Sequence, residues 1–337
     1  MTKPTLFGTH AGADVLEVTL RSDAGAEAKI ISFGAVLRDL HVPSKAGPQR
    51  VVLGFEKLED YPAHSPHFGA NPGRVANRIG HGRFTLDGVT YEVDKNQAGK
   101  HLLHGGKAGF GMRVWTLAEH DRRSATFVLI SDDGDMGFPG RVVTTCTYRL
   151  LEPATLHVSF TATTDKATPI NLAHHSYFNL DDGGLSSTRS HRLMLNALAY
   201  LPVDDELIPT GVVQPVEGTP FDFRQARPIE AGGAAYDHNF CLAAARGALH
   251  QGAWAQGAQS GVEMEVWTTE PGIQFYDGER AGRDVPGLEG RRYPAHAGFC
   301  LEAQVWPDAP NRPYFPQAVL WPGAIYRQTT EYRFRLP

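Results

Sequence analysis

The sequence predicts an all-β protein built from large, packed antiparallel sheets with little helix, and three observations support this fold class. Apolar and polar residues alternate with a period of two along several segments. Turn dipeptides that contain glycine separate these segments. The 337 residues also include 36 glycines and 23 prolines, a composition that favours tight turns over long helices.

The alternation is clearest in the segment 155–162, where every second residue is apolar. Successive side chains of a strand point to opposite faces, so this pattern predicts a half-buried antiparallel strand. The same pattern recurs at 142–150, around 262–266 and at 332–336 (Tyr332, Phe334 and Leu336). The predicted turns between strands include Asp87-Gly88, Asp133-Gly134, Asp182-Gly183-Gly184 and Asp277-Gly278.

Helix signals are weak. The best candidate, 242–258, is interrupted by three glycines, each of which costs a helix about 1 kcal/mol relative to alanine. We therefore expect a loop with a helical turn there. No low-complexity linker or change of composition divides the chain, and we expect a single domain over residues 1–337.

Composition excludes several classes of function. The net charge is −5, and no basic stripe of the kind that binds nucleic acid is present. No apolar run approaches the roughly 18 residues of a membrane span, and the first twelve residues lack the apolar core of a signal peptide. The three cysteines show no CxxC spacing and are expected to be reduced, as in a cytoplasmic protein.

Five segments depart from simple alternation and combine histidine, arginine, carboxylates and glycine. Each places titratable groups among apolar neighbours, where burial or a charged partner shifts a pKa. Neither a GxxxxGK[ST] phosphate loop nor a GxSxG nucleophile motif is present. Any single histidine could be structural, but together the segments favour proton transfer on a polyol. The five segments are 73–84, 101–106, 169–180, 236–242 and 298–308.

Histidine pairs raise the alternative of a metal site. His101 with His104, or His174 with His175, could each supply two ligands. No cysteine set or HExxH helix completes the three or four ligands that zinc requires. We therefore expect neither a metal nor another cofactor.

Taken in order, these segments resemble the aldose 1-epimerase (galactose mutarotase) family. The resemblance begins at 28–57 and continues through GRVANRI, HGG, DGDMGFPG, TPINLAHHSYFNL, DHNFCL, TEPGIQFY and LEAQVWPD. It implies a large antiparallel β-sandwich of the galactose mutarotase-like supersandwich type, with the site on an open concave face. The implied activity is interconversion of the α and β anomers of free aldoses, such as galactose and glucose, without a cofactor.

The resemblance also assigns roles to individual residues. His175 matches the family's general acid, and Glu302 matches its general base. The partner implied is a small-molecule aldose, bound by a protein that is a monomer or a homodimer. The positions that match sugar-binding residues are Asn77, Arg78, His104, Tyr177, Asp237 and Gln274.

Three features depart from the family pattern. His174 stands where asparagine is common, and Asn71-Pro72 precedes GRVANRI where small or β-branched residues are expected. The stretch 96–104 is one residue longer than the common spacing. We expect these changes to alter the surroundings of the site without removing a catalytic group.

Two rival functions remain at this point. A related epimerase acting on phosphorylated hexoses would need additional basic residues for the phosphate, and the ANRI and HGG segments resemble the free-sugar branch more closely. A sugar-binding module that has lost its chemistry is disfavoured because both His175 and Glu302 are present.

Overall fold

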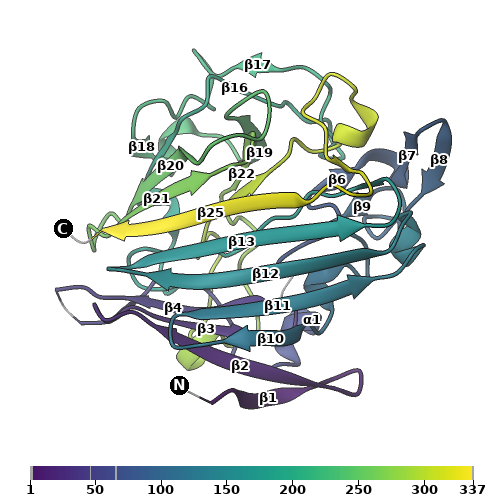
Figure 1. Ribbon diagram of the computed structural model, residues 1–337. Helices are drawn as coiled ribbons and strands as arrows, with labels where there is room; N and C mark the ends of the chain where they lie inside the picture. Colours follow the sequence, from purple (N-terminus) through teal and green to yellow (C-terminus); the bar gives the residue numbers. More distant parts are fainter. Residues whose placement is uncertain (1–2, 46, 65–66, 336–337) are drawn as a thin grey trace.

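The computed structural model describes residues 3–45, 47–64 and 67–335, and most of its regular structure is β-strand (Figure 1). Within these residues α1 (Asp60–His64) is the single α-helix. No helix in the described part of the chain has the length and apolar character needed to span a bilayer. The predicted all-β class is therefore confirmed.

A nine-stranded antiparallel sheet forms one layer of the molecule and crosses the front of Figure 1. Its centre consists of the long strands β12 and β13, with β25 inserted between β13 and β21 although it comes last in the sequence. In spatial order the strands are β10 (Thr116–His120), β11 (Ser124–Ser131), β12 (Val142–Leu151), β13 (Thr155–Thr164), β25 (Tyr326–Arg335), β21 (Glu263–Thr268), β20 (His250–Gln256), β15 (Arg192–Leu195) and β18 (Arg227–Pro228).

Two five-stranded sheets pack against this layer. The first contains β1 (Thr5–His10), β2 (Ala13–Arg21), β3 (Glu27–Ile31), β4 (Val36–Val42) and β5 (Gln49–Arg50). The second, in spatial order, contains β17 (Gln214–Pro215), β16 (Ala199–Tyr200), β19 (Asp237–Cys241), β22 (Gly272–Tyr276) and β23 (Cys300–Gln304). Leu40, Phe160 and Phe275, one from each sheet, belong to the same buried apolar cluster. The sheets therefore form a sandwich around a shared core.

Three short strand pairs complete the fold. β6 (Arg78–Ile79) pairs with β9 (Leu102–Leu103), and β14 (Thr168–Pro169) pairs with β24 (Val319–Leu320). The hairpin of β7 (Arg83–Leu86) and β8 (Val89–Glu92) turns at Asp87-Gly88, as predicted. Both turn residues have positive φ, 51° and 77°, as the favoured two-residue hairpin turn requires.

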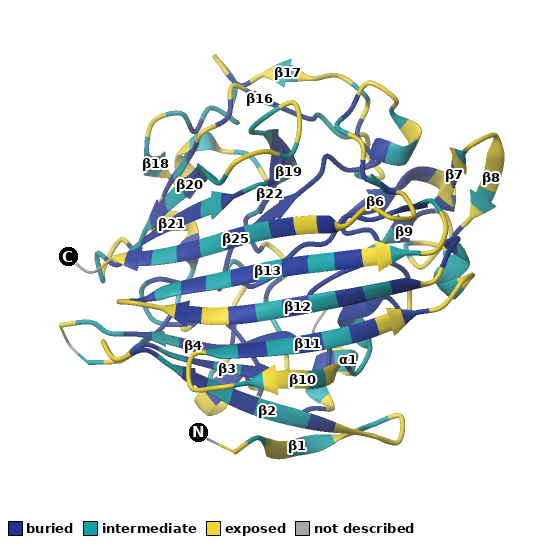
Figure 2. Ribbon diagram, in the orientation of Figure 1, coloured by how far each residue is buried: buried dark blue, intermediate teal, exposed yellow. Residues whose placement is uncertain are grey.

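The strands predicted from alternation are confirmed. Along β12 and β13 buried residues alternate with partly or fully exposed ones, and Figure 2 shows this as dark blue bands separated by teal and yellow bands. In β25, Tyr332 and Phe334 are buried as expected, whereas Leu336 lies outside the described residues. One face of each strand thus supplies the shared core.

The prediction of a helical turn within 242–258 is wrong. Residues 250–256 form strand β20, which pairs with β21 and places Ala253 and Ala255 in the core. The pairing register shifts between Gln251 and Ala253, so Gly252 occupies a β-bulge. A Cβ atom at this glycine would lie 2.8 Å from a methyl group of Leu242. Gly252, one of the three glycines that weakened the helix prediction, thus allows a strand to pack closely against Leu242.

Candidate active site

The side chains of His175 and Glu302 lie next to each other in the interior. The distance between His175 Nε2 and Glu302 Oε1 is 3.6 Å, and the two side chains are 5% and 3% exposed. The backbone fixes His175, because its N–H donates to the carbonyl of Ala70 at 2.9 Å and its carbonyl accepts from the N–H of Gly69 at 3.0 Å. The structure thus brings together the two residues to which the family resemblance gave acid and base roles.

Strand alternation determines which way Glu302 points. Leu301 on β23 and Phe275 on β22 belong to the main core cluster. Their neighbours Glu302 and Gln274 therefore point to the opposite face, where they are directly paired across the two strands. A carboxylate in the middle of an otherwise buried strand is in this way directed at a cavity rather than into the core.

His175 and Glu302 line a cavity of about 580 Å³, a volume typical of small-molecule sites. Of the six predicted sugar-binding residues, five line the same cavity: Asn77, Arg78, His104, Tyr177 and Asp237. Gln274 instead lines a small adjoining cavity behind Asp237. Other lining residues were not among the site residues predicted from the sequence, although Tyr236 and His238 lie in the candidate segment 236–242. They include His67, Gln97, Tyr236, His238, Tyr276 and Arg283.

Asn77 and His104 hold each other in place through two hydrogen bonds. The N–H of Asn77 donates to His104 Nδ1 at 3.1 Å, and the N–H of His104 donates to the carbonyl of Asn77 at 2.9 Å. Because Nδ1 accepts a hydrogen bond, the neutral His104 ring carries its hydrogen on Nε2. The following Gly105 has φ +85°, and a Cβ atom there would lie 1.7 Å from the carbonyl oxygen of Gly73. This contact explains the glycine after His104.

A chain of polar contacts connects Arg78, Asp237 and Gln274. Arg78 Nη2 lies 3.5 Å from Asp237 Oδ2, and Gln274 Nε2 donates to Asp237 Oδ1 at 2.6 Å. On its other side Arg78 Nε donates to Gln97 Oε1 at 3.0 Å. Gln97 belongs to the stretch 96–104 and lines the cavity, so this stretch forms part of the cavity wall. The Asp237 carboxylate is consequently held in one orientation.

Burial shifts the pKa values of the central pair in opposite directions. The pKa of Glu302 is raised well above its usual range, first by burial and then by the nearby Asp237 carboxylate, while Arg78 opposes the shift. The pKa of His175 is lowered well below its usual range, mainly by burial and then by the neighbouring His67. Because burial disfavours an isolated charge on either group, the pair retains one proton over a wide pH range.

Three aromatic rings surround His175. The ring of Tyr177 stacks on it at a centroid distance of 5.2 Å and an angle of 13°. His67 and His104 lie at 5.3 and 5.1 Å. Burial lowers the pKa of His67 to about 4, so this ring is neutral at physiological pH. The only signal for His67 in the sequence is a histidine beside Phe68, outside every motif considered.

The two histidine pairs considered as metal ligands do not form. His174 turns away from the cavity, where Nδ1 lies 3.0 Å from Asn71 Oδ1 and Nε2 lies 2.7 Å from Ser176 Oγ. His101 accepts a hydrogen bond from the N–H of His81 and contacts Glu206 with its other nitrogen. Only His104 and His175, one from each pair, face the cavity.

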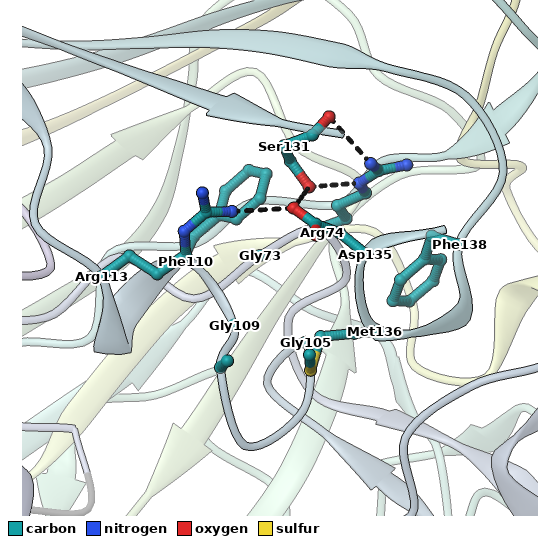
Figure 3. Close-up of a pocket in the computed structure, with 11 residues that line it drawn as sticks. Gly73, Arg74, Gly105, Gly109, Phe110, Arg113, Ser131, Asp135, Met136 and Phe138 are labelled. Carbon is teal, nitrogen blue, oxygen red and sulfur yellow. Dashed lines mark hydrogen bonds and ion pairs between the residues drawn. The ribbon is translucent and has the colours of Figure 1, made fainter. Parts of the chain in front are cut away.

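A separate pocket of about 10 Å³ lies around the buried Arg74 (Figure 3). The guanidinium donates to Ser131 Oγ at 2.9 Å and to the carbonyl of Pro139 at 2.8 Å. Ser131 Oγ and Arg113 both donate to Asp135 at 3.0 Å. The space holds at most a single water molecule, so this cluster is structural: it connects GRVANRI to the DGDMGFPG turn.

Comparison with known proteins agrees with this architecture. The sandwich is of the galactose mutarotase type, because an aldose epimerase homologue from C. elegans superimposes with a TM-score of 0.89 at 30% sequence identity, covering 95% of this chain and 98% of that chain. The sequence model of the aldose 1-epimerase family matches residues 17–333. The chain belongs to the aldose 1-epimerase family, as the sequence motifs predicted.

Similar proteins include enzymes from animals and bacteria. The galactose mutarotase of Rattus norvegicus is 43% identical over 340 residues, which cover 98% of this chain and 97% of the relative. The aldose 1-epimerase of Escherichia coli K12 is 38% identical and covers 94% of each chain. The similarity therefore extends over nearly the whole protein.

Proposed function

We propose that this protein interconverts the α and β anomers of free aldoses, such as galactose and glucose, by acid–base ring opening and reclosure. The observation that carries the proposal is the His175–Glu302 contact of 3.6 Å at a cavity lined by hydrogen-bonding side chains. Membership of the aldose 1-epimerase family supports it, as do relatives named galactose mutarotase and aldose 1-epimerase.

In ring opening, Glu302 takes the proton of the anomeric hydroxyl while His175 gives a proton to the ring oxygen. The C1–O1 bond becomes the aldehyde carbonyl, and the bond between C1 and the ring oxygen breaks. Rotation about the first carbon–carbon bond presents the other face of the aldehyde. Reclosure reverses the proton transfers: the Glu302 carboxylic acid donates and the neutral His175 accepts.

The shared proton explains why one pair serves both directions. Imidazolium with carboxylate, and imidazole with carboxylic acid, contain the same number of protons. Ring opening starts from the first form and leaves the second, and reclosure restores the first. Because burial raises the pKa of Glu302 and lowers the pKa of His175, the proton rests on Glu302 in the free site, and ring opening requires its transfer to His175 once the sugar is bound. Burial of both groups favours retention of that one proton, because it disfavours both the doubly protonated cation and the fully deprotonated anion.

The remaining polar residues bind and orient the sugar. His104 directs Nε2–H, and Arg78 its guanidinium, at the cavity, where they stabilise charge that develops on the reacting oxygens. Asp237 and Asn77 form hydrogen bonds with ring hydroxyls. Gln274 acts through Asp237, to which it donates, and Tyr177 orients His175 by stacking. Gln274 and Tyr177 are thus positioning residues.

The rival functions are less well supported by the same geometry. Three arginines line the cavity: Arg78 is already engaged by Asp237 and Gln97, and Arg283 donates to backbone carbonyls, so a phosphate would depend mainly on Arg280. A mere binding module has no need of a buried acid–base pair, which costs free energy of folding. We also propose one functional domain over residues 1–337, as a monomer or homodimer in the cytoplasm; the free thiols Cys146, Cys241 and Cys300 support a reducing setting.

Polarimetry of freshly dissolved α-D-glucose and α-D-galactose tests the function. The protein is expected to accelerate the change of rotation without altering its end point. Glucose 6-phosphate serves as the comparison substrate, and a clear preference for it would favour the phosphorylated-sugar epimerase. Tight binding of galactose without acceleration would favour the binding module.

A further inference from the structure

Leu207 lines the main cavity and also the small adjoining cavity behind Asp237, so it lies at the wall that the two cavities share. Asn77, Arg78 and Asp237 line both cavities as well. An apolar residue is thus placed among the polar side chains to which we assign the binding of sugar hydroxyls. Leu207 is half-buried and belongs to none of the four buried apolar clusters of the described residues, so core packing does not account for it.

The backbone of Leu207 is in the left-handed region, with φ +63°. This conformation is unfavourable for a leucine because its Cβ atom crowds the backbone, whereas glycine and asparagine adopt it more easily. Asn77 and His104, two other residues of the cavity, also have positive φ, at 60° and 50°. Strained residues of this kind persist where the surrounding structure enforces them, and they gather at binding sites. The position therefore holds a leucine at the cavity although its backbone favours other residues.

Hydrogen bonds within the loop 204–208 enforce this conformation. Asp204 Oδ1 accepts the N–H of Glu206 at 2.9 Å, and the Asp204 carbonyl accepts the N–H of Leu207 at 2.9 Å. Glu206 Oε2 also lies 3.0 Å from His101 Nε2, the ring atom that carries the hydrogen because Nδ1 accepts a hydrogen bond. The loop is thus fastened to the stretch 96–104, and Leu207 is preorganised at the cavity wall.

We propose that Leu207 is a specificity-determining residue, which selects aldoses that present C–H groups rather than a hydroxyl to this wall of the cavity. The proposal deepens the proposed function and rests on it for the class of substrate. A hydroxyl directed at the leucine loses its hydrogen bonds to water and finds no partner there, whereas a C–H group loses none. Arg78 and Asp237 recognise hydroxyls on their side of the sugar, and Leu207 recognises the absence of a hydroxyl on its own side.

The expected discrimination is modest. A hydrophobic contact rejects a misplaced hydroxyl by about tenfold to a hundredfold, because only the unpaired polar group disfavours binding. The effect should appear chiefly in KM, since Leu207 takes no part in the proton transfers between the sugar, His175 and Glu302.

Steady-state kinetics on a series of related sugars test the proposal. Mannose, allose and galactose each differ from glucose in the orientation of one hydroxyl, and xylose lacks the hydroxymethyl group. Leu207→Asn supplies a hydrogen-bonding group and tolerates positive φ. We expect it to raise kcat/KM for one sugar of the series by about tenfold relative to the others, because one ring position faces this wall.

Two further variants serve as comparison and control. Leu207→Gly removes the side chain and relieves the backbone, so the preference among the sugars should weaken while KM for the favoured sugars rises several fold. Leu198→Asn makes the same substitution as Leu207→Asn at a leucine that is 75% exposed and does not line the cavity. It should change neither the kinetic constants nor their ratios. Urea denaturation establishes that each variant is folded.

Calorimetric affinities for the same sugars give a second readout, in which the ratios should shift in the same way. Unchanged ratios in both Leu207 variants would overturn the proposal, and so would an equal change for every sugar, which would assign Leu207 a structural role. If the wild type binds the sugars without accelerating mutarotation, the proposed function falls, while the affinity ratios still decide whether Leu207 selects among the sugars.

Discussion

The Nδ1 atom of His174 lies 3.0 Å from Oδ1 of Asn71, so two buried polar side chains contact each other in the interior. The Asn71 amide nitrogen donates to the carbonyl of Ala35 at 2.7 Å and to the hydroxyl of Tyr148 at 2.8 Å. Its oxygen must therefore accept, and His174 carries its hydrogen on Nδ1. The pair lies behind His175 and supports the segment that holds the proposed acid.

A double-mutant cycle tests this contact. Asn71→Ala and His174→Ala are each expected to lower the free energy of unfolding by roughly 1–3 kcal/mol, because each leaves buried polar atoms without partners. The double variant should lose clearly less free energy of unfolding than the sum of the two single losses, since the second substitution removes a polar group that already lacks its partner. Urea denaturation supplies the values. Strict additivity would show that the two residues are not coupled.

His174 should also make stability depend on pH. Burial lowers its pKa to about 3, whereas the unfolded chain titrates near 6.5. Between these values the unfolded state binds a proton that the folded state does not, so stability falls as pH falls, by about 1.4 kcal/mol per pH unit for this group. Denaturation of wild type and His174→Asn at pH 7, 6 and 5 compares the slopes. The variant should show the shallower one; equal slopes would contradict the assignment.

The pH profile of kcat/KM tests whether His175 and Glu302 share one proton over a wide pH range. If burial moves the pKa of Glu302 up and that of His175 down, the singly protonated pair persists on both sides of the ordinary values, roughly 4.3 and 6.5. Activity is expected to stay level well above pH 6.5 and to decline only when the pair loses its last proton. A basic limb centred near pH 6.5 would mean that His175 titrates as an ordinary exposed histidine.

Arg78 is expected to act mainly in binding. Arg78→Ala removes a charged donor from the cavity and leaves Asp237 with one fewer partner. We expect kcat/KM to fall by about tenfold to a hundredfold, chiefly through KM, as for the loss of a charged hydrogen bond. Steady-state kinetics at several sugar concentrations separate the two parameters. Arg149→Ala, at an exposed position of β12, is the control, and an unchanged KM for Arg78→Ala would assign Arg78 a structural role.

The sequence predicted the fold where one physical rule dominated. Alternation identified β12 and β13, because each has one face in the core. It failed at β20, where the glycine of a β-bulge resembled a helix interruption. Local pattern could not reveal that the bulge accommodates Leu242, since that contact depends on the folded chain.

Residues of the candidate site could be predicted only where they belong to a recognisable sequence motif. His175 and Glu302 were found through the family resemblance, whereas His67 belongs to no motif and was missed. The metal alternative with His174 and His175 fails for a geometric reason: adjacent residues of an extended segment point to opposite sides, so the two rings cannot bind the same metal ion. The grouping of His104, His175 and Glu302 joins three distant segments and required the structure.

The acid–base role of His175 and Glu302 is tested most directly by Glu302→Gln, assayed by polarimetry for turnover and by calorimetry for sugar binding. An amide of the same shape cannot take the proton of the anomeric hydroxyl. We expect galactose still to bind within a few fold of the wild-type affinity while turnover falls by about 10²–10⁴-fold. A variant that binds and turns over galactose at near wild-type rates would contradict it.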